Sequence, residues 1–369
     1  MTRFIKLFFY SLLILFVIWG FFVIFLSKVG LETKRFNNLI IEQVKKYNDD
    51  INIDIKKVKI YLSIKNIVKP KLIISTKDPT LILDNNKIKL KTIDTKIDIL
   101  SYFKDNFVIE KFEISTKDNK IKDLISIAAL EKPSLIFYNL FIKEGYAKIN
   151  IHLKFDENGK ISNYKFDGEV KKTKLKYDEK YSFGNINFYF SNQEGKTLIK
   201  DANFSYKKIK FLSDGVTILT DPDGKTKVNG NIGTEKNTVN TKLIEDIFEK
   251  DLKFINNQEV GFKIENKFSF MVQNEKIKAL EHSSKIDLDE VSIKPKNVLL
   301  KNYFSNYKDS VLLKNNSIIL KYKNENLSVE GESEYSFNSS FDKIKYEINK
   351  KNDNYNFLTE INFDSNPLK

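Results

Sequence analysis

The residues best suited to chemistry in this chain are its two histidines. His152 lies on the polar side of an alternating segment, and His282 lies in the run Glu281-His282-Ser283-Ser284. A Ser-His pair needs a histidine held beside a nucleophile, and a zinc site needs several ligands at short spacing. Two histidines 130 residues apart, with no H-x-x-x-H pair, do not give either pattern. We therefore interpret both as ordinary polar residues.

Acidic clusters and glycine motifs are also poor candidates for a site. Asp287, Asp289 and Glu290 lack the glycine and the twelfth-position glutamate of an EF-hand, and Asp221-Pro222-Asp223-Gly224 is typical of a turn. No P-loop, dinucleotide-binding or G-x-S-x-G pattern occurs. The chain has no cysteine, which excludes disulfides, thiolate zinc sites and cysteine nucleophiles. The sequence predicts no catalytic residue, no metal and no cofactor, and thus a protein that is not an enzyme.

The net charge of +13 invites a nucleic-acid interpretation, but the kind of cation argues against it. Arg3 and Arg35 are the only arginines among 62 cationic residues. Base readout and bidentate phosphate contacts favour arginine, whereas lysine fills solvated positions when a genome is rich in A and T. We therefore expect no nucleic-acid partner.

The N-terminus carries a segment that could cross a bilayer. Leu7 to Leu26 is twenty residues without a charge, of which sixteen are Leu, Ile, Phe or Val. At 1.5 Å per residue it spans a hydrocarbon core of about 30 Å. The run is longer than the apolar part of a signal peptide, and no small-x-small site follows it, so an uncleaved anchor is favoured over a cleaved signal. We place residues 1–6 in the cytoplasm, although counting the flanking lysines and arginines alone would point the other way.

Beyond the anchor, the period of the apolar residues changes. Residues 32–47 have apolar positions at helical spacing, which predicts an amphipathic helix, and two further helices are expected at Asp118–Glu131 and Thr241–Leu252. Almost everything else alternates with a period of two, the pattern of half-buried strands. The alternation slips by one residue at Lys56-Lys57, which predicts a bulge. We expect one β-rich region at residues 48–132 and a second at 133–369.

The predicted fold is mainly β: one transmembrane helix, then a long antiparallel meander of roughly twenty strands with a few short helices. Three short helices cannot cover the apolar side of so many strands. The sheet must therefore either close as a sandwich or curl into a groove whose apolar side holds lipid. For each apolar strand position, ordinary core and lipid lining remain open alternatives. The candidate groove-lining residues are Ile53, Ile55, Val58, Ile60, Leu62, Leu81, Leu83, Ile88, Leu90, Ile97, Ile99, Phe112 and Ile114.

The first 115 residues resemble the AsmA-like family of bacterial envelope proteins, which are similar to the chorein-type lipid-transfer bridges of eukaryotes. The resemblance rests on the order of elements: the anchor, the helix with Phe36 and Leu39-Ile40, the strand Ile53 to Leu62, a hairpin at Asn85-Asn86, and a strand pair running from Ile93 to Ile114. Asp105-Asn106 stands where many members carry a glycine turn, and no proline follows Ile114, so the subfamily stays undefined.

This resemblance implies a protein anchored once in the bacterial inner membrane through Leu7 to Leu26, with most of the chain in the periplasm. Its partners would be phospholipid acyl chains and other envelope proteins, and its role would be phospholipid transport between the inner and outer membranes. The alternative is a scaffold or assembly factor for the outer membrane. Because the chain ends directly after a predicted strand, we also expect it to be the N-terminal part of a longer protein.

Overall fold

The computed structural model describes residues 2–34, 37–47, 49–64, 70–84, 86–98, 109–156, 158–249, 251–274, 276–295, 300–304, 307, 309–337, 340–351 and 354–365. The chain is mainly β and divides into two compact units. Unit 1 comprises residues 1–180 and 189–194, and unit 2 comprises residues 181–188 and 195–369. The two units share strand β11 (Ser182–Gln193). The predicted mainly β fold with one long apolar helix is confirmed.

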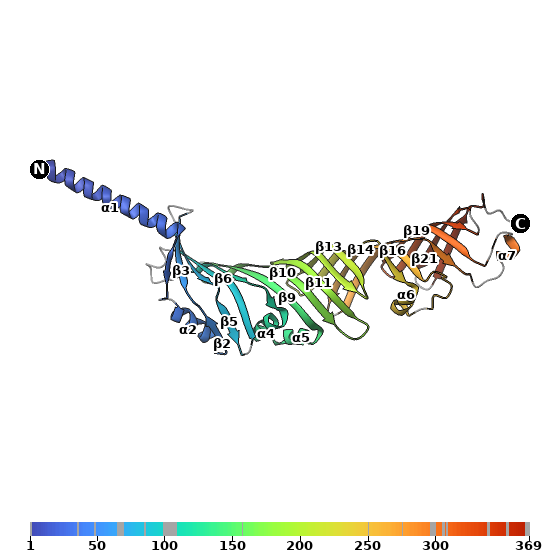
Figure 1. Cartoon of the computed structure of the whole chain (residues 1–369), viewed down its shortest axis with the longest axis horizontal. Helices are drawn as coiled ribbons and strands as arrows, with labels where there is room; N and C mark the ends of the chain where they lie inside the picture. Colours follow the sequence, from blue (N-terminus) through green and yellow to red (C-terminus); the bar gives the residue numbers. More distant parts are fainter. Residues whose placement is uncertain are drawn as a thin grey trace. The chain divides into compact units, whose positions relative to one another are not determined.

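Unit 1 begins with the apolar helix α1 (Thr2–Lys28), which projects from the sheet in Figure 1. Its stretch Tyr10–Lys28 is long and apolar enough to cross a membrane, and none of it is buried by the rest of the protein. Gly30 ends the helix with a left-handed φ of +74°, and its N–H donates to the Phe25 carbonyl at 3.1 Å. A Cβ at Gly30 would lie 2.8 Å from both the Ile60 carbonyl oxygen and the Tyr61 ring, so glycine is required there.

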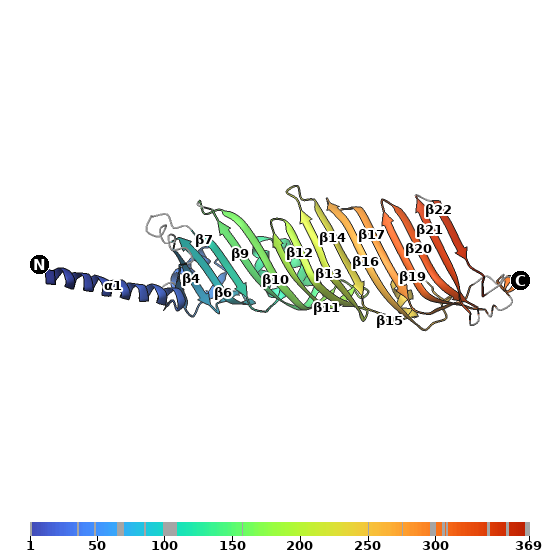
Figure 2. The same ribbon diagram turned by 90° about the horizontal axis from the view of Figure 1, so that it is seen from above.

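The main sheet of unit 1 is an antiparallel array in which each strand pairs with the next one in the row. The row is β1 (Leu31–Thr33), β3 (Val58–Ser63), β4 (Lys71–Lys77), β6 (Asn86–Asp98), β7 (Ile109–Thr116), β9 (Ile142–Phe155) and β10 (Ile161–Lys176). No pairing among the described residues joins β10 back to β1, so this sheet stays open. Figure 2 shows the strands side by side.

A small second sheet and helix α2 (Asn37–Tyr47) cover one end of this array. Strand β5 (Thr80–Leu83) pairs with β2 (Ile51–Asp54) and with the first four residues of β6. Ile53, Ile55 and Val58 form a buried cluster, and Ile40, Ile41 and Val44 of α2 pack on it. The slip at Lys56-Lys57 is therefore not a bulge. It separates two strands that belong to different sheets, because the chain turns there from the covered end into the main sheet.

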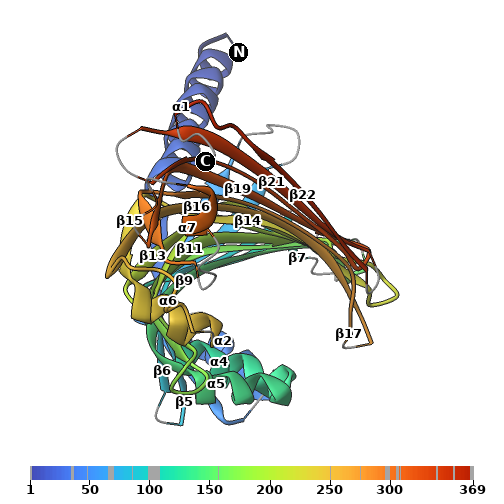
Figure 3. The same cartoon turned by 90° about the vertical axis from the view of Figure 1, so that its right-hand side faces the viewer.

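Another insertion follows β7 and contains β8 (Asn119–Lys120), α4 (Ile121–Glu131), the 3₁₀ helix η1 (Pro133–Phe137) and α5 (Tyr138–Phe141). Buried Asn119 fixes its start, since the side-chain amide donates to the Lys89 carbonyl at 2.9 Å and accepts from the Lys89 N–H at 2.7 Å. Figure 3 shows α2, α4 and α5 together on the inner side of the bent strands of unit 1.

Unit 2 repeats the same plan. Its row is β12 (Lys196–Tyr206), β13 (Ile209–Thr220), β14 (Thr226–Thr234), β16 (Glu259–Gln273), β17 (Lys276–Leu288), β19 (Val311–Lys323), β20 (Asn326–Ser336), β21 (Asp342–Lys351) and β22 (Asn354–Ile361). Consecutive strands are antiparallel, and no described pairing joins β22 back to β12. The predicted meander is confirmed in both units.

Short elements cover one end of the strands of unit 2. Helix α6 (Thr241–Phe248), which follows β15 (Asn237–Asn240), packs Leu243 and Ile244 against a cluster that includes buried Phe262. After β18 (Val291–Ile293) come α7 (Leu300–Tyr303) and an aromatic cluster. The members of this cluster are Phe304, Tyr307, Val311, Tyr335 and Phe337.

Several predicted boundaries differ from the structure. The helix expected at 32–47 starts at Asn37, because residues 31–33 pair with β3 instead. Helix α6 ends at Phe248 rather than at Leu252. The next residue, Glu249, adopts a left-handed φ of +53°, which ends the helix. The two units divide at β11 rather than near residue 132, because α4 packs back on β6 and β9 and cannot be separated from them.

Candidate functional site

The strand register of unit 1 sorts the side chains of its main sheet into an apolar and a polar face. Residues directly opposite each other on paired strands lie on the same face, and their neighbours along the strand lie on the other. One row across six strands is Ile60, Ile74, Thr95, Phe112, Leu153 and Tyr164. The row beside it is Val58, Thr76, Ile93, Ile114, Ile151 and Phe166. These two rows define the apolar face of unit 1, which at about 4.8 Å per strand is roughly 24 Å wide.

The structure divides the predicted lining residues between a covered and a half-exposed part. Seven are buried by the protein itself: Ile53, Ile55, Val58, Leu83, Ile88, Leu90 and Ile97. Five are half-buried: Ile60, Leu62, Leu81, Phe112 and Ile114. Ile99, the last one, lies outside the described residues. The buried group includes the residues packed under α2, so a lipid chain could reach only the half-buried group without displacing the protein's own core.

The apolar face extends beyond the residues that the sequence singled out. Leu72, Ile74, Leu153 and Phe166 are half-buried and lie in the same rows or directly beside them. Their alternation was visible in the sequence, but which strand lies next to which, and in what register, was not. The cross-strand rows therefore appear only in the folded structure.

The polar face of unit 1 carries a network of charged side chains centred on His152. Its Nδ1 lies 2.7 Å from Glu113 Oε1, and its Nε2 lies 3.5 Å from Asp167 Oδ1. Lys111 Nζ also contacts Glu113, at 2.6 Å, and Lys165 Nζ contacts Asp167 at 3.1 Å. The residues come from three adjacent strands, so the network ties β7, β9 and β10 together across the solvent side of the sheet.

This network shifts the pKa of both carboxyl groups. Burial alone would raise the pKa of Glu113, but hydrogen bonds from Lys111 and His152 outweigh it and hold that pKa below its ordinary value of 4.5. The pKa of Asp167 is also lowered, because hydrogen bonds from Asn150 and Lys165 outweigh the effect of burial. Both carboxylates are thus more stable as anions in the folded protein than in the unfolded chain.

The lowered pKa of Glu113 predicts a loss of stability in acid. A carboxyl group with a depressed folded-state pKa stabilises the fold above its unfolded pKa, and this contribution disappears as the pH falls through the folded value. We expect the wild-type protein to lose stability more steeply below pH 4.5 than the Glu113→Gln variant. Urea unfolding of both proteins between neutral and acidic pH measures this difference. The prediction would be contradicted if the free energy of unfolding of the two proteins changed with pH in the same way.

Unit 2 also has an apolar face, which contains both aliphatic and aromatic side chains. One row across six strands is Asn266, Ser284, Leu320, Val329, Ile348 and Phe357. The next row is Ile264, Ile286, Ile318, Gly331, Tyr346 and Thr359. The Tyr346 ring covers Gly331, where a Cβ would lie 2.1 Å from the ring, and burial raises the pKa of its hydroxyl.

His282 and Ser284 lie two residues apart on this apolar face. The Ser284 hydroxyl is 3.1 Å from His282 Nε2 and also donates to Asn266 Oδ1. A catalytic serine would need the histidine as its proton acceptor and an acid to orient that histidine. In the part of the chain that the structure describes, no carboxylate pairs with His282. The serine is instead held by an amide, so the arrangement is that of a polar group satisfied within an apolar surface.

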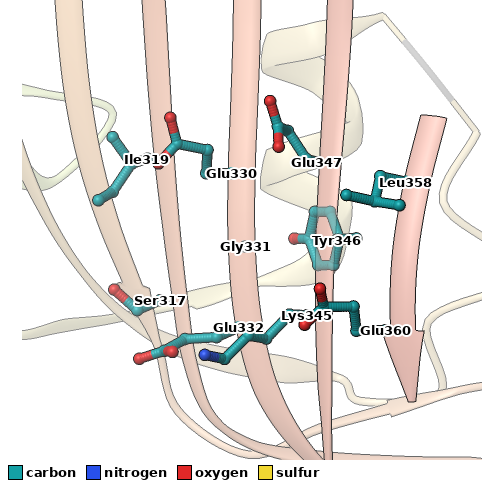
Figure 4. A pocket seen from close by; sticks show the side chains of 10 residues that line it. All are labelled: Ser317, Ile319, Glu330, Gly331, Glu332, Lys345, Tyr346, Glu347, Leu358 and Glu360. Atoms are coloured by element: carbon teal, nitrogen blue, oxygen red, sulfur yellow. The ribbon is translucent and has the colours of Figure 1, made fainter. Parts of the chain in front are cut away.

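The polar face of unit 2 contains a shallow depression of about 400 Å³ across β19 to β22 (Figure 4). The carboxylates of Glu330, Glu332, Glu347 and Glu360 surround it, with Lys345 among them. Lys321 Nζ pairs with Glu330 at 3.0 Å. Within the described residues, no group of three or more His, Asp or Glu side chains is arranged to hold a metal ion. This depression is a solvated charged surface.

Together these observations define the chain as an open, two-faced antiparallel β-sheet protein with an N-terminal apolar helix. Comparison of the sequence and the fold with protein-family models, with curated proteins and with solved structures gave no match. The function therefore has to be inferred from the geometry.

Proposed function

We propose that this protein is a membrane-anchored, AsmA-like envelope protein that binds phospholipid acyl chains on the apolar face of its sheet. The observation that carries the proposal is the pair of apolar rows in unit 1, in which aliphatic and aromatic residues of up to six strands align in register and, apart from buried Val58, remain half-exposed. Soluble proteins rarely leave such large contiguous apolar surfaces free, and those that do usually bind a partner or a ligand there.

The physical mechanism is passive. Acyl chains would lie against the apolar face, while the headgroups stay in water beyond the ends of the strands. Each CH2 group of the acyl chain that is buried on this face contributes about 0.8 kcal/mol to the free energy of binding. Because neighbouring rows are chemically alike, a bound chain meets similar surroundings as it moves from strand to strand. Such a surface offers no direction by itself, so directional transport would need an external source of free energy.

The covered end of the sheet supports this function by giving the sheet a rigid core. The buried cluster of Ile53, Ile55 and Val58, with α2 packed on it, stabilises unit 1 and involves only the first strands of the rows, where Ile74 and Ile93 pack against it. The fold can therefore remain stable while the rest of the apolar face stays accessible to a ligand.

The setting that we propose is the bacterial inner membrane, with α1 as a single anchor and the sheet in the periplasm. The length and hydropathy of Tyr10–Lys28 support the anchor. In this setting the sheet would receive phospholipid from the inner membrane and contribute to its passage toward the outer membrane.

Two pairs of adjacent isoleucines give a direct test. Ile74 and Ile318 lie on the apolar faces of units 1 and 2, and their neighbours Ile73 and Ile319 lie on the polar faces. All four are half-buried, so each pair is matched in residue type, strand and exposure. A photoreactive amino acid is placed at each position of the full chain, expressed in a bacterial membrane, irradiated and analysed by mass spectrometry.

We expect phospholipid adducts at positions 74 and 318 and none above background at 73 and 319. The physical reason is the period of two in a strand, which places adjacent side chains on opposite faces. Equal adduct yields at both members of a pair, or no adduct at any position in a folded protein, would refute the proposal.

A second candidate, an assembly scaffold, is favoured by one observation. Strand β22 lies at the end of its row, and all eight of its residues are exposed, among them Tyr355, Phe357 and Leu358. An exposed strand edge can pair with a strand of another protein. Protein adducts at position 357, together with the absence of lipid adducts at positions 74 and 318, would favour the scaffold.

A further inference from the structure

A basic cavity of about 980 Å³ lies in unit 1, on the polar face next to the end of α1. Seven lysines and three carboxylates line it, which leaves a net charge of +4 by count, seven minus three. The lysines come from segments between Lys56 and Lys148 and meet only in the folded structure. A volume of this size lies at the upper end of the range of small-molecule sites.

The three carboxylates are Glu32, Asp78 and Asp118, and the first two form ion pairs with lysines of the cavity. Glu32 pairs with Lys57 at 2.9 Å and with Lys59 at 3.9 Å, and Asp78 pairs with Lys117 at 2.7 Å. The hydrogen bond from Lys57 lowers the pKa of Glu32, and the one from Lys117 lowers that of Asp78, so both are ionised at neutral pH.

Four lysines of the cavity are left over after these pairs. Lys56, Lys77, Lys91 and Lys148 have no carboxylate within ion-pair distance in the part of the chain that the structure describes. Their positive charges repel one another across the cavity, and an anion bound among them would relieve this repulsion. The cavity therefore fits a ligand that carries one or more negative charges.

The position of the cavity relates this anion to the membrane. Lys28 is the last residue of α1, and Glu32, only four residues further on, already lines the cavity. Four extended residues reach about 14 Å at most. Tyr61, another lining residue, lies against Gly30 at the turn that ends α1. The headgroup layer extends about 5 to 8 Å beyond the hydrocarbon core, and electrostatic attraction acts over a further 8 to 10 Å or so.

We propose that this lysine cavity binds the phosphate headgroup of an anionic phospholipid in the leaflet from which α1 emerges. Because β1 follows α1 after only two residues, a headgroup held in the cavity would fix the orientation of the sheet relative to the bilayer surface. This role is separate from acyl-chain binding, since the cavity and the apolar rows lie on opposite faces of the sheet.

The test compares two lipids that have the same acyl chains. The full chain, purified in a nonionic detergent, is titrated with dioleoylphosphatidylglycerol or dioleoylphosphatidylcholine, and bound lipid is counted by native mass spectrometry. Any contribution from the apolar face or from α1 is similar for both lipids, so the difference between them reports on the headgroup. We expect the phosphatidylglycerol to bind about tenfold more tightly or better, because each nearby lysine contributes severalfold to binding at an anionic surface.

The variant removes three of the unpaired lysines as Lys56→Gln, Lys77→Gln and Lys91→Gln. We expect its preference for the anionic lipid to fall to within about twofold, with binding of the zwitterionic lipid unchanged. The matched control, Lys196→Gln, Lys225→Gln and Lys276→Gln, removes the same charge from exposed positions of unit 2 and should keep the preference.

Three outcomes would overturn the proposal. The first is equal binding of the two lipids by the wild-type protein. The second is a preference that survives in the cavity variant or disappears equally in the control. The third is inorganic phosphate that binds the lipid-free wild-type protein more tightly than the anionic lipid does, with this binding lost in the cavity variant, which would assign the cavity to a free anion. Each of these can occur whether or not acyl chains bind to the apolar face.

Discussion

We expect phospholipid binding by unit 1 to become much weaker when Phe112 and Leu153 are both changed to Asn. The two side chains lie directly opposite each other on β7 and β9 in the middle of the apolar face, and neither is fully buried by the protein. The loss of their contact with an acyl chain reduces the binding free energy by about 2 to 4 kcal/mol, which corresponds to roughly 30- to 700-fold weaker binding. The readout is the yield of phospholipid adduct at a photoreactive residue in position 74.

The control for this prediction uses the neighbouring pair on the same two strands. Lys111 and Lys154 are also opposite each other, but on the polar face. Changing both to Asn alters the sheet at adjacent positions with the same new side chains and should leave the adduct yield within about twofold, since surface substitutions usually have small effects. Circular dichroism of both variants checks that they fold. A similar decrease in both variants would mean that the apolar face is not the binding surface.

The largest expected loss of stability comes from the aromatic cluster of unit 2. Phe337 is 8% exposed, and its ring centroid lies 4.5 Å from that of Phe304, 5.6 Å from that of Tyr307 and 5.5 Å from that of Tyr335. Phe337→Ala would leave a cavity among these rings. We expect it to lower the free energy of unfolding of unit 2 by about 3 to 5 kcal/mol and its melting temperature by about 6 to 20 °C.

Phe357 provides the matched control, because it is the same residue type in the same unit but is 71% exposed. Phe357→Ala should change the free energy of unfolding by less than about 0.5 kcal/mol. Thermal unfolding by calorimetry gives both values, and hydrogen exchange of β20 and β21 shows whether the loss is local to the cluster. A Phe337→Ala protein that melts within about 2 °C of the wild type would show that the cluster does not stabilise unit 2.

The contrast between these two phenylalanines shows where the sequence stopped being informative. Both occur in or beside alternating segments, and neither the residue type nor the spacing distinguishes them. Phe337 is buried because the segment around Phe304 and Tyr307 folds over it, whereas Phe357 lies on the last strand of the row. Burial depends on which segments meet in space, and local periodicity does not contain that information.

The same limit explains the outcome for the candidate lining residues. Alternation correctly indicated that Ile53, Ile60 and Phe112 belong to apolar sides of strands. It could not show that Ile53 lies under α2 while Phe112 is half-exposed, since that depends on how the helix returns to the sheet. Ile97, which pattern alone made as good a candidate as any, is only 1% exposed, so its role is structural.

The lysine cavity is the clearest case of a feature that the sequence concealed. Lysine is so abundant that Lys56, Lys77, Lys91 and Lys148 carry no local signal, and they are spread over about ninety residues. Antiparallel pairing of β3, β4, β6, β7 and β9 brings their segments together beside the end of α1. The sequence did contain one hint, a reversed balance of positive charge after the apolar helix, but it gave no reason to connect it with later strands.

The sequence by itself determined the apolar helix, the mainly β character and the two-faced strands, because these depend on composition and on the period of nearby residues. Only the tertiary structure decided which strands pair, which part of the apolar face is covered, and that the polar face holds both the His152 network and the lysine cavity. The physical reason is that a strand fixes the side to which each residue points but not its neighbour. Register and long-range packing set that neighbour, and with it every surface on which a function could be built.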